Sequence, residues 1–289
     1  MSWRIVVISR RAKLELQMNY MVIRNDTTLK IHLSEIYQLL IESTAVSITT
    51  SLLVELIKRK INIIFCDEKR LPCGNVVSYY GSHDTSQKYK RQMSWNKKIK
   101  DLIWTEIITE KIRKQSYFLE ELGKVKEFNL LENYIEQIQI GDETNREGHA
   151  AKVYFNALFG MEFTRTQDNE INSALNYGYS IILSAVAREI VSQGYCTQVG
   201  IFHDNMFNEF NLACDLMEPY RILVDRKVKS MKLEKFEFEE KMHLVNILND
   251  VVKINGKMEY VTKAIKIYIK SVFDALEQLD VSLISFYSI

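Results

Sequence analysis

Hydrophobic periodicity divides this chain of 289 residues into two parts. Before about residue 80, the apolar residues fall in short segments rich in β-branched side chains, which is typical of strands. After the polar, turn-rich segment 81–87, they recur at helical spacing. Strands followed by helices predict an α+β fold. We therefore predict a small N-terminal β-sandwich-like domain over residues 1–80 and a larger all-α domain over residues 81–289.

The first part contains short predicted strands around one helix. Residues 51–60 carry leucines and isoleucine at helical spacing after a serine and predict a short helix. Residues 61–65 are apolar except for Asn62 and predict a buried strand. The remaining predicted strands cover residues 4–9, 14–18, 21–24, 29–33 and 46–49.

Composition bears on nucleic-acid binding, on membrane insertion and on the redox compartment of the protein. The formal net charge is +1, so any nucleic-acid surface must be a local patch. No apolar run approaches the length of about 18 residues that a membrane span needs. The four cysteines show no metal-ligand spacing and are expected to be buried free thiols in a reducing compartment. We expect a cytoplasmic protein with no membrane contact.

Residues 86–123 are predicted to form one long helix, or two that are broken near Ser116. Residues 86–114 contain nine lysines and arginines against three acids, which leaves a net charge of +6. Trp95 and Trp104 lie in the same stretch. The segment is either a solvated face with a tryptophan-anchored core side or a surface that follows DNA phosphates.

A carboxylate on an apolar helix face marks the next segment. Helices are predicted at 129–140 and, after a cap at Thr144 or Asn145, up to Gly160. Glu147 falls in line with Ala150, Ala151, Tyr154 and Leu158, which form the inward stripe. A buried carboxylate is usually paired or bound to a metal. The alternative is that Glu147 closes a capping box with Thr144.

Residues 169–195 predict a long helix whose small residues allow close packing. Asn172, Asn176 and Tyr179 form a polar stripe on it. These groups are either satisfied internally or line a polar cleft. Two further helices are predicted at 236–249 and 261–279.

The segment 203–221 carries the clearest chemical signal. Asp215 and Glu218 lie one helical turn apart and follow His203, so the three side chains are able to meet at one divalent cation. The alternative is a surface helix with two solvated acids. Pro219 removes a helical hydrogen bond and should kink or interrupt this helix.

Three pieces of sequence, read together, resemble a known family. They are R-E-G-H-A-A-K-V-Y-F at 146–155, N-S-A-L-N-Y-G-Y-S at 172–180 and H-D-N…D-L-M-E-P-Y-R at 203–221. In this order behind a β-rich part, they resemble the CRISPR-associated integrase of spacer acquisition, an adaptation endonuclease. The details are similar to its type II-A branch, and the resemblance covers essentially the whole chain.

The resemblance implies a metal site and several partners. The family's metal-binding trio maps onto Glu147, His203 and Glu218, which would hold Mg²⁺ or Mn²⁺, with Glu218 standing where many relatives have aspartate. His149 should point elsewhere. The implied partners are a second copy in a homodimer, a small ferredoxin-like companion that bridges two dimers into a heterohexamer, double-stranded prespacer DNA, leader–repeat DNA, and the type II-A effector nuclease and ring-forming accessory protein. The predicted near-site residues are Asp215, Asn172, Asn176, Tyr177 and Arg221.

The implied reaction is DNA transesterification, in which the 3′-OH end of a short fragment attacks a phosphodiester at the repeat boundary. Metal binding requires neutral His203, so activity should fall as pH drops toward about 6. One alternative is a nuclease that hydrolyses branched DNA without integration, and another is a non-catalytic DNA-binding scaffold. The predicted DNA-binding residues are Arg221, Arg226, Lys227, Lys229, Lys88, Lys90 and Arg91.

Overall fold

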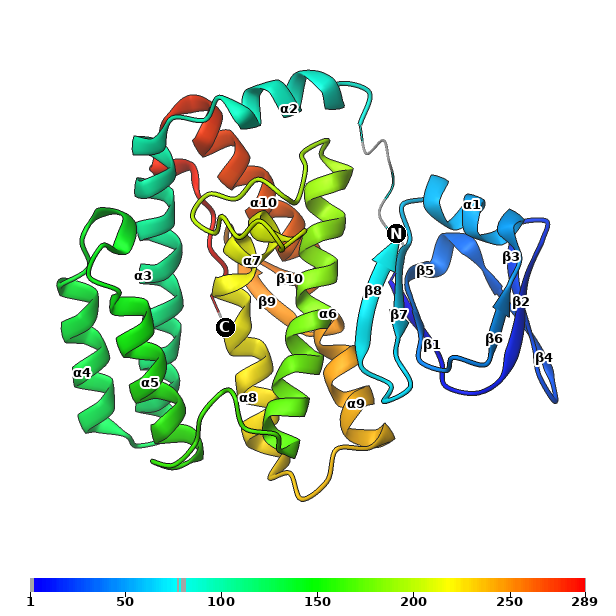
Figure 1. The fold of residues 1–289 in the computed structure, drawn as a ribbon, viewed down its shortest axis with the longest axis horizontal. Helices are drawn as coiled ribbons and strands as arrows, with labels where there is room; N and C mark the ends of the chain where they lie inside the picture. Colours follow the sequence, from blue (N-terminus) through cyan, green and yellow to red (C-terminus); the bar gives the residue numbers. More distant parts are fainter. Residues whose placement is uncertain (1–2, 77, 79–81, 289) are drawn as a thin grey trace. The chain divides into compact units, whose positions relative to one another are not determined.

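A computed structural model describes residues 3–76, 78 and 82–288 of the chain. It divides into two compact units, Met1–His83 and Asp84–Ile289, which are described separately (Figure 1). The predicted boundary between residues 80 and 81 lies outside the described residues.

The first unit contains two sheets of four strands each. One sheet has the order β1 (Arg4–Ile8), β5 (Ile36–Ile41), β7 (Asn62–Cys66) and β8 (Pro72–Val76), with β8 alone antiparallel to its neighbour. The other has the order β4 (Thr28–His32), β3 (Tyr20–Arg24), β2 (Ala12–Gln17) and β6 (Val46–Ile48), with β6 parallel to β2.

The two sheets share one apolar core. Leu14 and Met21 of one sheet, Leu39 and Ile63 of the other, and Leu56 of α1 (Thr50–Lys58) belong to a single buried cluster. The strand-rich N-terminal region is therefore confirmed, and so is the short helix. A sheet buries its apolar face against another layer, and α1 contacts both β2 and β7.

Sequence reasoning misses two strands of this unit, β5 and β8. All residues of β5 are buried, so its sequence Ile-Tyr-Gln-Leu-Leu-Ile shows no alternation. It lies in the middle of its sheet between two parallel neighbours, where both faces are covered. Its buried amide Gln38 accepts a hydrogen bond from Asn62 of β7, 3.0 Å away.

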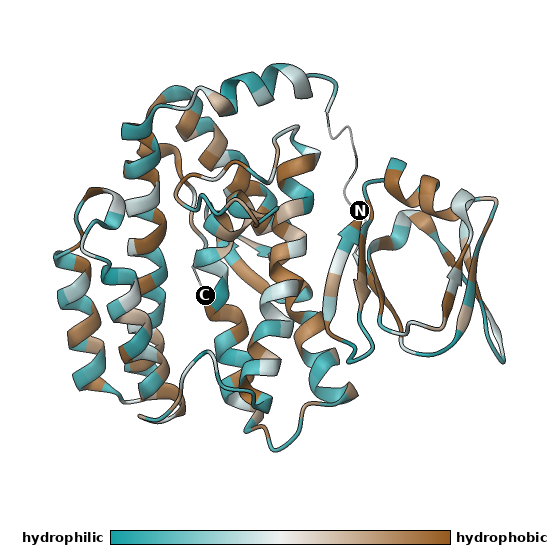
Figure 2. Cartoon of the chain, in the orientation of Figure 1, coloured by the Kyte–Doolittle hydropathy of each residue, from teal (hydrophilic) through white to brown (hydrophobic). Residues whose placement is uncertain are grey.

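The second unit consists mainly of helices. Figure 2 shows α2 as largely hydrophilic, in keeping with its single buried residue, whereas α6 and α10 carry long apolar stretches. The elements are α2 (Thr85–Met93), α3 (Lys97–Glu121), α4 (Val125–Glu136), η2 (Ile140–Asp142), α5 (Arg146–Phe159), α6 (Glu170–Ser192), α7 (Asn211–Met217), η3 (Glu218–Tyr220), α8 (Arg221–Met231), α9 (Phe238–Val245), η4 (Asn246–Asn249), β9 (Val251–Ile254), β10 (Lys257–Tyr260), α10 (Val261–Gln278) and η5 (Val281–Leu283). In the described residues, no helix is both long and apolar enough to cross a membrane.

The prediction that this part is all-α is wrong, because β9 and β10 form an antiparallel hairpin. Asn255 and Gly256 connect the strands, and both have positive φ angles of 49° and 75°. Asn-Gly in this conformation is the strongest short-range hairpin signal, and it lies between the two predicted helices. Near the end of the chain, the side chain of Tyr287 is buried, and its hydroxyl donates to the carbonyl oxygen of Pro219 at 2.8 Å.

The break in the basic helical segment is not near Ser116. The chain leaves helical structure between α2 and α3, and Asn96 then caps α3 by accepting a hydrogen bond from the Lys98 amide at 2.8 Å. Ser116 lies inside α3, where its hydroxyl donates to the carbonyl oxygen of Arg113 at 2.9 Å. That internal bond lets a serine lie in a helix interior. Helix α4 also begins and ends about four residues before its predicted limits.

Two long helices organise the second unit. Helix α6 contacts α7, α8, α9 and α10, while α3 contacts α4, α5 and η3. The close approach of α6 to α8 depends on Gly178, because an added Cβ there would lie 2.4 Å from Cγ1 of Val224. This agrees with the prediction that small residues of this helix allow close packing.

We expect Gly178→Ala to lower the free energy of unfolding by about 1–2 kcal/mol. Overpacking costs about 1–3 kcal/mol and outweighs the gain of about 1 kcal/mol in helix propensity. Denaturant unfolding would measure it. In a Val224→Ala background the same substitution should cost much less, since the clashing methyl groups are gone. An equal cost in both backgrounds would contradict this packing account.

Candidate active site

Glu147 lies in the first turn of α5, whose N-terminus is closed by two side chains. Asn145 accepts a hydrogen bond from the Gly148 amide at 3.3 Å and is the cap. Asp142 accepts from the amides of Arg146 and Glu147, at 2.7 and 3.0 Å. These bonds satisfy donors that a helix start leaves unpaired. The capping-box alternative is therefore wrong, because Glu147 is not needed at the cap and Thr144 does not accept its bond.

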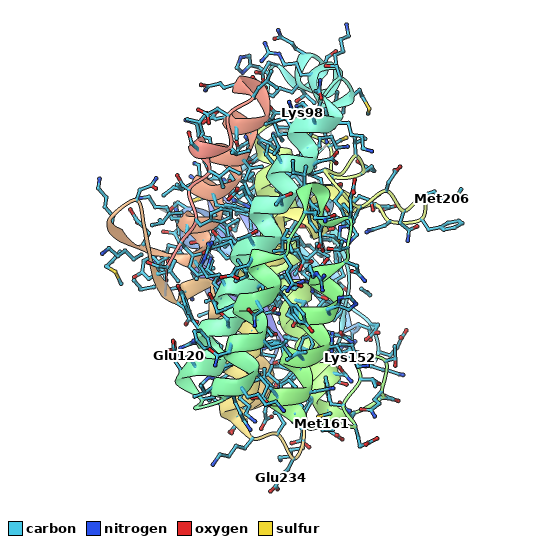
Figure 3. The ribbon with its side chains drawn as sticks, turned by 90° about the vertical axis from the view of Figure 1, so that its left-hand side faces the viewer. Lys98, Glu120, Lys152, Met161, Met206 and Glu234 are labelled. Atoms are coloured by element: carbon cyan, nitrogen blue, oxygen red, sulfur yellow. The ribbon has the colours of Figure 1, made fainter. Side chains whose placement is uncertain are left out.

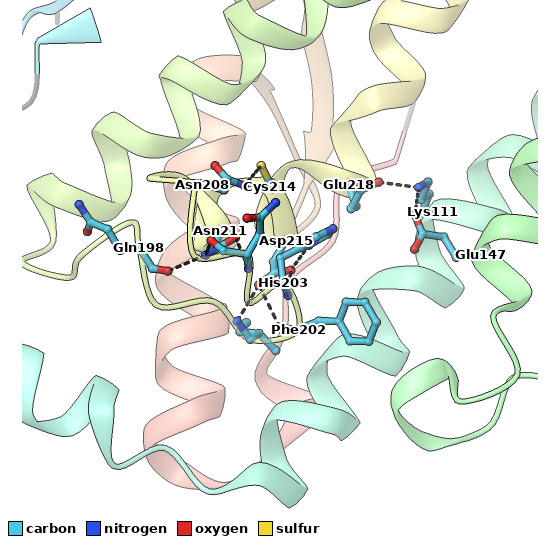
Figure 4. A network of polar contacts seen from close by, with 12 residues as sticks. Lys111, Glu147, Gln198, Phe202, His203, Asn208, Asn211, Cys214, Asp215 and Glu218 are labelled. Atoms are coloured by element: carbon cyan, nitrogen blue, oxygen red, sulfur yellow. Dashed lines mark hydrogen bonds and ion pairs between the residues drawn. The ribbon is translucent and has the colours of Figure 1, made fainter. Parts of the chain in front are cut away.

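The side chain of Glu147 faces inward, as its stripe predicts. Ala150, Tyr154 and Leu158 on the same stripe are buried. Oε1 of Glu147 lies 2.5 Å from Nζ of Lys111 on α3 (Figure 4). A carboxylate on an apolar face is thus paired, which is the condition for burying charge.

Glu218 lies where helix α7 ends. Pro219 interrupts the helix as predicted, and α7, η3 and α8 follow one another as separate elements. The Glu218 side chain is 3% exposed, and its Oε2 lies 2.5 Å from Lys111 Nζ while its Oε1 accepts from Arg221 Nε at 2.9 Å. Burial alone would raise the pKa of Glu218, but Arg221 and Lys111 outweigh it and lower the pKa to about 2.

Lys111 therefore bridges two carboxylates from different elements. Burial tends to lower the pKa of Lys111, but Glu218 and Glu147 raise it above the ordinary value. With Arg221 included, the cluster contains two acids and two cations, so its formal charge is zero. The position between the carboxylates is one that suits a cation.

Asp215 organises the loop that carries His203. It is fully buried and accepts hydrogen bonds from the amides of Ile201, Phe202 and His203, at 2.6, 3.1 and 3.1 Å. Gly200 leaves room for this turn, since a Cβ there would lie 2.7 Å from Asp215 Oδ2 and 2.3 Å from the His203 carbonyl oxygen.

The His203 ring is held by the same carboxylate. Its Nδ1 lies 2.6 Å from Asp215 Oδ1, and the ring packs edge-on against Trp104 at 5.7 Å. Phe202 stacks on Trp104 at 4.3 Å. The hydrogen bond to Asp215 raises the pKa of His203 against the opposing effect of burial, and the charges of Glu218 and Glu147 add to the rise. Nε2 of His203 has no protein partner in the described ranges and is oriented for a proton or a ligand.

The two carboxylates one turn apart have separate roles. Asp215 already accepts four hydrogen bonds, so the expectation that it converges with Glu218 on one cation does not hold. The alternative of two solvated acids is also wrong, because both are buried. Among the described residues, no three His, Cys, Asp or Glu side chains are grouped closely enough to hold a metal ion. The donor set nevertheless fits a cation, since Glu147 and Glu218 already clamp the ammonium of Lys111.

A cleft of about 790 Å³ opens beside these residues. Its walls come from the start of α3, the turn before α5 and the loop 198–204. Glu147 and His203 lie on its lining together with Lys97, Lys100 and Asp101. The lining contains five carboxylates (Asp101, Asp142, Glu143, Glu147 and Asp204) and the imidazole of His203 against two ammonium groups. Such a cleft favours a cation, and an anionic phosphodiester would bind there together with one.

Comparison with known proteins identifies the family. A family model described as CRISPR associated protein Cas1 matches residues 5–253. The chain belongs to the Cas1 family. It is 36% identical over 229 residues to the CRISPR-associated endonuclease Cas1 of Neisseria meningitidis serogroup C (strain 8013), covering 79% of this chain and 75% of that relative. It is 27% identical over 242 residues to CRISPR-associated endonuclease Cas1 1 of Francisella tularensis subsp. novicida (strain U112), covering 76% of each.

Solved structures share the Cas1-like fold. A casposase bound to integration product gives a TM-score of 0.79 at 18% identity, over 97% of this chain and 93% of that chain. A CAS1 protein from Thermotoga maritima gives 0.75 at 17% identity, over 95% and 97%. A Cas6-RT-Cas1–Cas2 complex gives 0.78 at 17% identity, over 97% of this chain and 36% of that chain. At these identities the likeness shows the fold, with strands first and helices afterwards.

The predicted near-site residues of this Cas1 family member divide into two groups. Arg221 contacts Glu218, and its guanidinium lies 4.6 Å from the ring of Tyr179. Asn172 and Asn176 instead accept bonds from Arg165. The buried Asn172 is a polar group satisfied internally, which was the first of the two alternatives for that stripe, whereas Asn176 is exposed.

Tyr177 and His149 lie away from the cluster. The Tyr177 ring packs edge-on against Phe236 at 5.6 Å, and Lys241 lies 5.7 Å from it. The exposed His149 packs near Tyr134, as expected for a residue that is not a ligand.

Most of the predicted DNA-binding residues bind within the protein. Their contacts are Arg221 with Glu218, Arg226 with Glu121, Lys227 with Asp250, Arg91 with Glu277, Lys229 with the Leu158 carbonyl and Lys88 with the Gln193 carbonyl. Only Lys90 of the predicted set is exposed with no ion pair in the part of the chain that the structure describes. A side chain already paired is less available for DNA phosphates.

Sequence reasoning missed Lys111 and Trp104 as site residues. Both were assigned to the basic helix as a whole. A signal was present, because Lys111 follows Ile103 and Ile107 at intervals of four residues on the buried face of α3. The rule that singled out Glu147, a charge on an apolar stripe, applies equally to this lysine. The expected burial of the thiols is also wrong for Cys73, which is exposed.

We predict that His203 titrates above 6.5 in the metal-free protein and that Asp215→Asn lowers its pKa, since the amide removes the charge that stabilises the imidazolium. Imidazole resonances followed by NMR against pH would measure both values. Because His203 keeps its proton to higher pH than free histidine, activity that needs neutral imidazole should fall as the pH is lowered, and the fall should begin at a higher pH than it would for a free histidine. An unchanged His203 pKa in a folded Asp215→Asn protein would contradict the role of Asp215.

Proposed function

We propose that this Cas1 family member is the integrase of CRISPR spacer acquisition, which joins the 3′-OH ends of short DNA fragments into the leader–repeat of a CRISPR array. One observation carries the proposal: two carboxylates from separate elements clamp a cation beside a cleft that also holds an imidazole and lysines. Family membership and the likeness to a casposase bound to integration product support it.

The reaction is a phosphoryl transfer between DNA strands. The 3′-oxygen of the fragment forms a bond to phosphorus, the existing bond to the 3′-oxygen of the repeat strand breaks, and the proton of the attacking hydroxyl passes to solvent. Glu147, Glu218 and His203 would hold Mg²⁺ or Mn²⁺, and the mixture of carboxylate and imidazole suits Mn²⁺ well. When bound, such an ion neutralises charge on phosphoryl oxygens and lowers the pKa of a hydroxyl.

The other residues of the site orient the proposed metal ligands or provide charge for binding DNA. Asp215 fixes the His203 ring and leaves Nε2 directed away from that bond. Arg221 holds Glu218 from the side opposite Lys111, and Tyr179 supports Arg221 through its ring while its hydroxyl donates to Asp225. Lys97 and Lys100 at the cleft provide positive charge for the DNA backbone.

The proposed assembly contains a homodimer, and two dimers are bridged by the small ferredoxin-like companion into a heterohexamer. The structural likeness to a Cas6-RT-Cas1–Cas2 complex supports such a partner. Prespacer and leader–repeat duplexes are the DNA partners. The type II-A assignment, with its effector nuclease and ring-forming accessory protein, stays a prediction.

Glu147→Gln should reduce strand joining by about 100-fold or more, since one carboxylate of the clamp becomes neutral while its shape is kept. Purified protein, its companion, a short duplex with free 3′ ends and a plasmid bearing the leader–repeat would be incubated with Mn²⁺ or Mg²⁺, and joined strands would be measured. Glu143→Gln is a matched control, because the exposed Glu143 lies on the same cleft outside the clamp.

Product analysis separates the competing functions. Relatives in the family are named endonucleases, so cleavage of branched DNA without joining would favour the hydrolytic alternative. Equal joining by wild type and a folded Glu147→Gln would remove Glu147 from the mechanism. A loss of thermal stability in this variant without any biochemical defect would favour the non-catalytic scaffold.

The DNA path is proposed to follow the start of α3 instead of α8. Lys97 and Lys98 are exposed, Lys100 is half-buried, and these three have no ion pair within the described sequence. Figure 3 shows Lys98 at the outer end of this helix. The basic segment predicted from the sequence therefore contributes through residues 97–100, where charge is not already neutralised.

Replacing Lys97 and Lys100 together by alanine should weaken binding of all duplex sequences alike and reduce the slope of log K against log salt by about 2, one for each phosphate contact. Binding titrations at several salt concentrations without divalent metal would measure it. Lys227→Ala is the control, since Lys227 is paired with Asp250 at 2.9 Å. Equal salt slopes for the double variant and wild type would overturn this path.

A further inference from the structure

Lys111 is buried at the centre of the candidate site. It lies near the middle of α3 between the fully buried Ile108 and Ile112, and its side chain is 9% exposed. Isolated ammonium groups are rarely buried, because removing them from water costs far more than apolar packing returns. Here two carboxylates offset that cost, each with an oxygen 2.5 Å from Nζ.

The two carboxylates depend on Lys111 in return. Glu147 comes from α5 and Glu218 from η3, so no shared element fixes their distance. Without a cation between them, the two negative charges would repel each other, and the buried Glu218 would be screened little by water. Arg221 neutralises Glu218 only from the other side, at Oε1. The oxygens that face the Lys111 ammonium, Oε1 of Glu147 and Oε2 of Glu218, are therefore the ones open to a different cation.

Charge balance limits which cations can occupy the position between Glu147 and Glu218. Lys111 and Arg221 carry two positive charges, and Glu147 and Glu218 carry two negative charges. Adding a divalent ion while Lys111 stays would leave an excess of two positive charges around the buried Lys111 and Glu218 side chains, which is unfavourable. Exchange of the ammonium for the ion leaves a smaller excess.

We propose that Lys111 is a displaceable internal cation: its ammonium holds Glu147 and Glu218 together in the metal-free protein, and a divalent ion binds by displacing it. This rests on the proposed function in that Glu147 and Glu218 are taken as metal ligands. Lys111 is a positioning residue that preorganises the carboxylates and weakens metal binding by competition. Its flexible four-carbon stem lets the ammonium leave while α3 stays in place.

The first test is the affinity for Mn²⁺ of wild type and Lys111→Met, measured by the electron paramagnetic resonance signal of free Mn²⁺. Methionine keeps the apolar stem and removes the charge. We expect about tenfold tighter binding or more, because a competing buried ion pair is removed, and a larger rise of Tm on adding Mn²⁺. Lys114→Met is the matched control. Lys114 is also buried on α3 but pairs with Glu110 at 3.0 Å, so its loss should leave Mn²⁺ affinity unchanged.

Equal or weaker Mn²⁺ binding by Lys111→Met would overturn the proposal, as would an absence of binding by both proteins. Binding by Lys111→Met alone would support it, since competition would then be complete in wild type.

A second test uses wild type, so it does not depend on how the variant folds. Amine acetylation followed by mass spectrometry would report the accessibility of Lys111. We expect weak labelling in the metal-free protein, several-fold stronger labelling at saturating Mn²⁺, and no such response in Glu147→Gln. Unchanged protection of Lys111 while Mn²⁺ is bound would overturn the proposal.

The two proposals fail in different ways. Metal-dependent release of Lys111 without any strand joining would refute the integrase reaction and leave the exchange intact. Strand joining by wild type with Lys111 still protected at saturating Mn²⁺ would refute the exchange and leave the integrase intact.

Discussion

The ion pairs of Lys111 with Glu147 and Glu218 are the interaction on which the rest of the site depends. They connect the middle of α3, the first turn of α5 and the start of η3, which are distant in sequence. Each of these charges is tolerable in its buried position only because the others are there. The geometry of α5 and η3 relative to α3 is therefore coupled to electrostatics as well as to apolar packing. A site that handles phosphodiesters needs such prearranged charge, because reorganisation during the reaction would raise its barrier.

Two further buried carboxylates, those of Asp215 and Asp225, hold neighbouring groups by hydrogen bonds. Asp215 accepts the amides of the His203 loop, while Asp225 accepts the hydroxyls of Tyr154 and Tyr179. Burial raises the pKa of Asp225 to about 6 in spite of those bonds. Tyr179 also supports Arg221, so the helices α5, α6 and α8 meet in polar contacts next to the ion-paired cluster. The second unit thus has an apolar core in which a few acids fix the orientation of the functional groups.

The sequence pattern predicted those elements whose exposure alternates. Strand β2 and helix α5 have one buried and one exposed side, and both were found from periodicity. Strands β5 and β8 and the hairpin β9–β10 were missed. Strand β5 shows no alternation because both of its faces are covered, although the similarly buried β7 was found from its apolar residues. The hairpin was missed although its Asn-Gly turn is a hairpin signal. The position of the break in the basic helix was also wrong, since the capping side chain of Asn96 carries more information about a helix start than a serine in the interior. Apolar and polar residues alternate where one face is buried and the other meets water, so an element that is buried on all sides shows no such alternation.

The sequence by itself determined the order of strands before helices, the inward direction of Glu147, the interruption at Pro219 and, through three short motifs, the family. These features depend on neighbours along the chain or on residue types that the family shares. Only the tertiary structure decided which charges meet. In the folded chain, Lys111 pairs with Glu147 and Glu218, and Asp215 accepts hydrogen bonds from the His203 loop. Most of the basic residues that had been predicted to bind DNA are paired with acids. Pairing between charges depends on distances of a few ångströms between remote segments, and a one-dimensional pattern contains no measure of them.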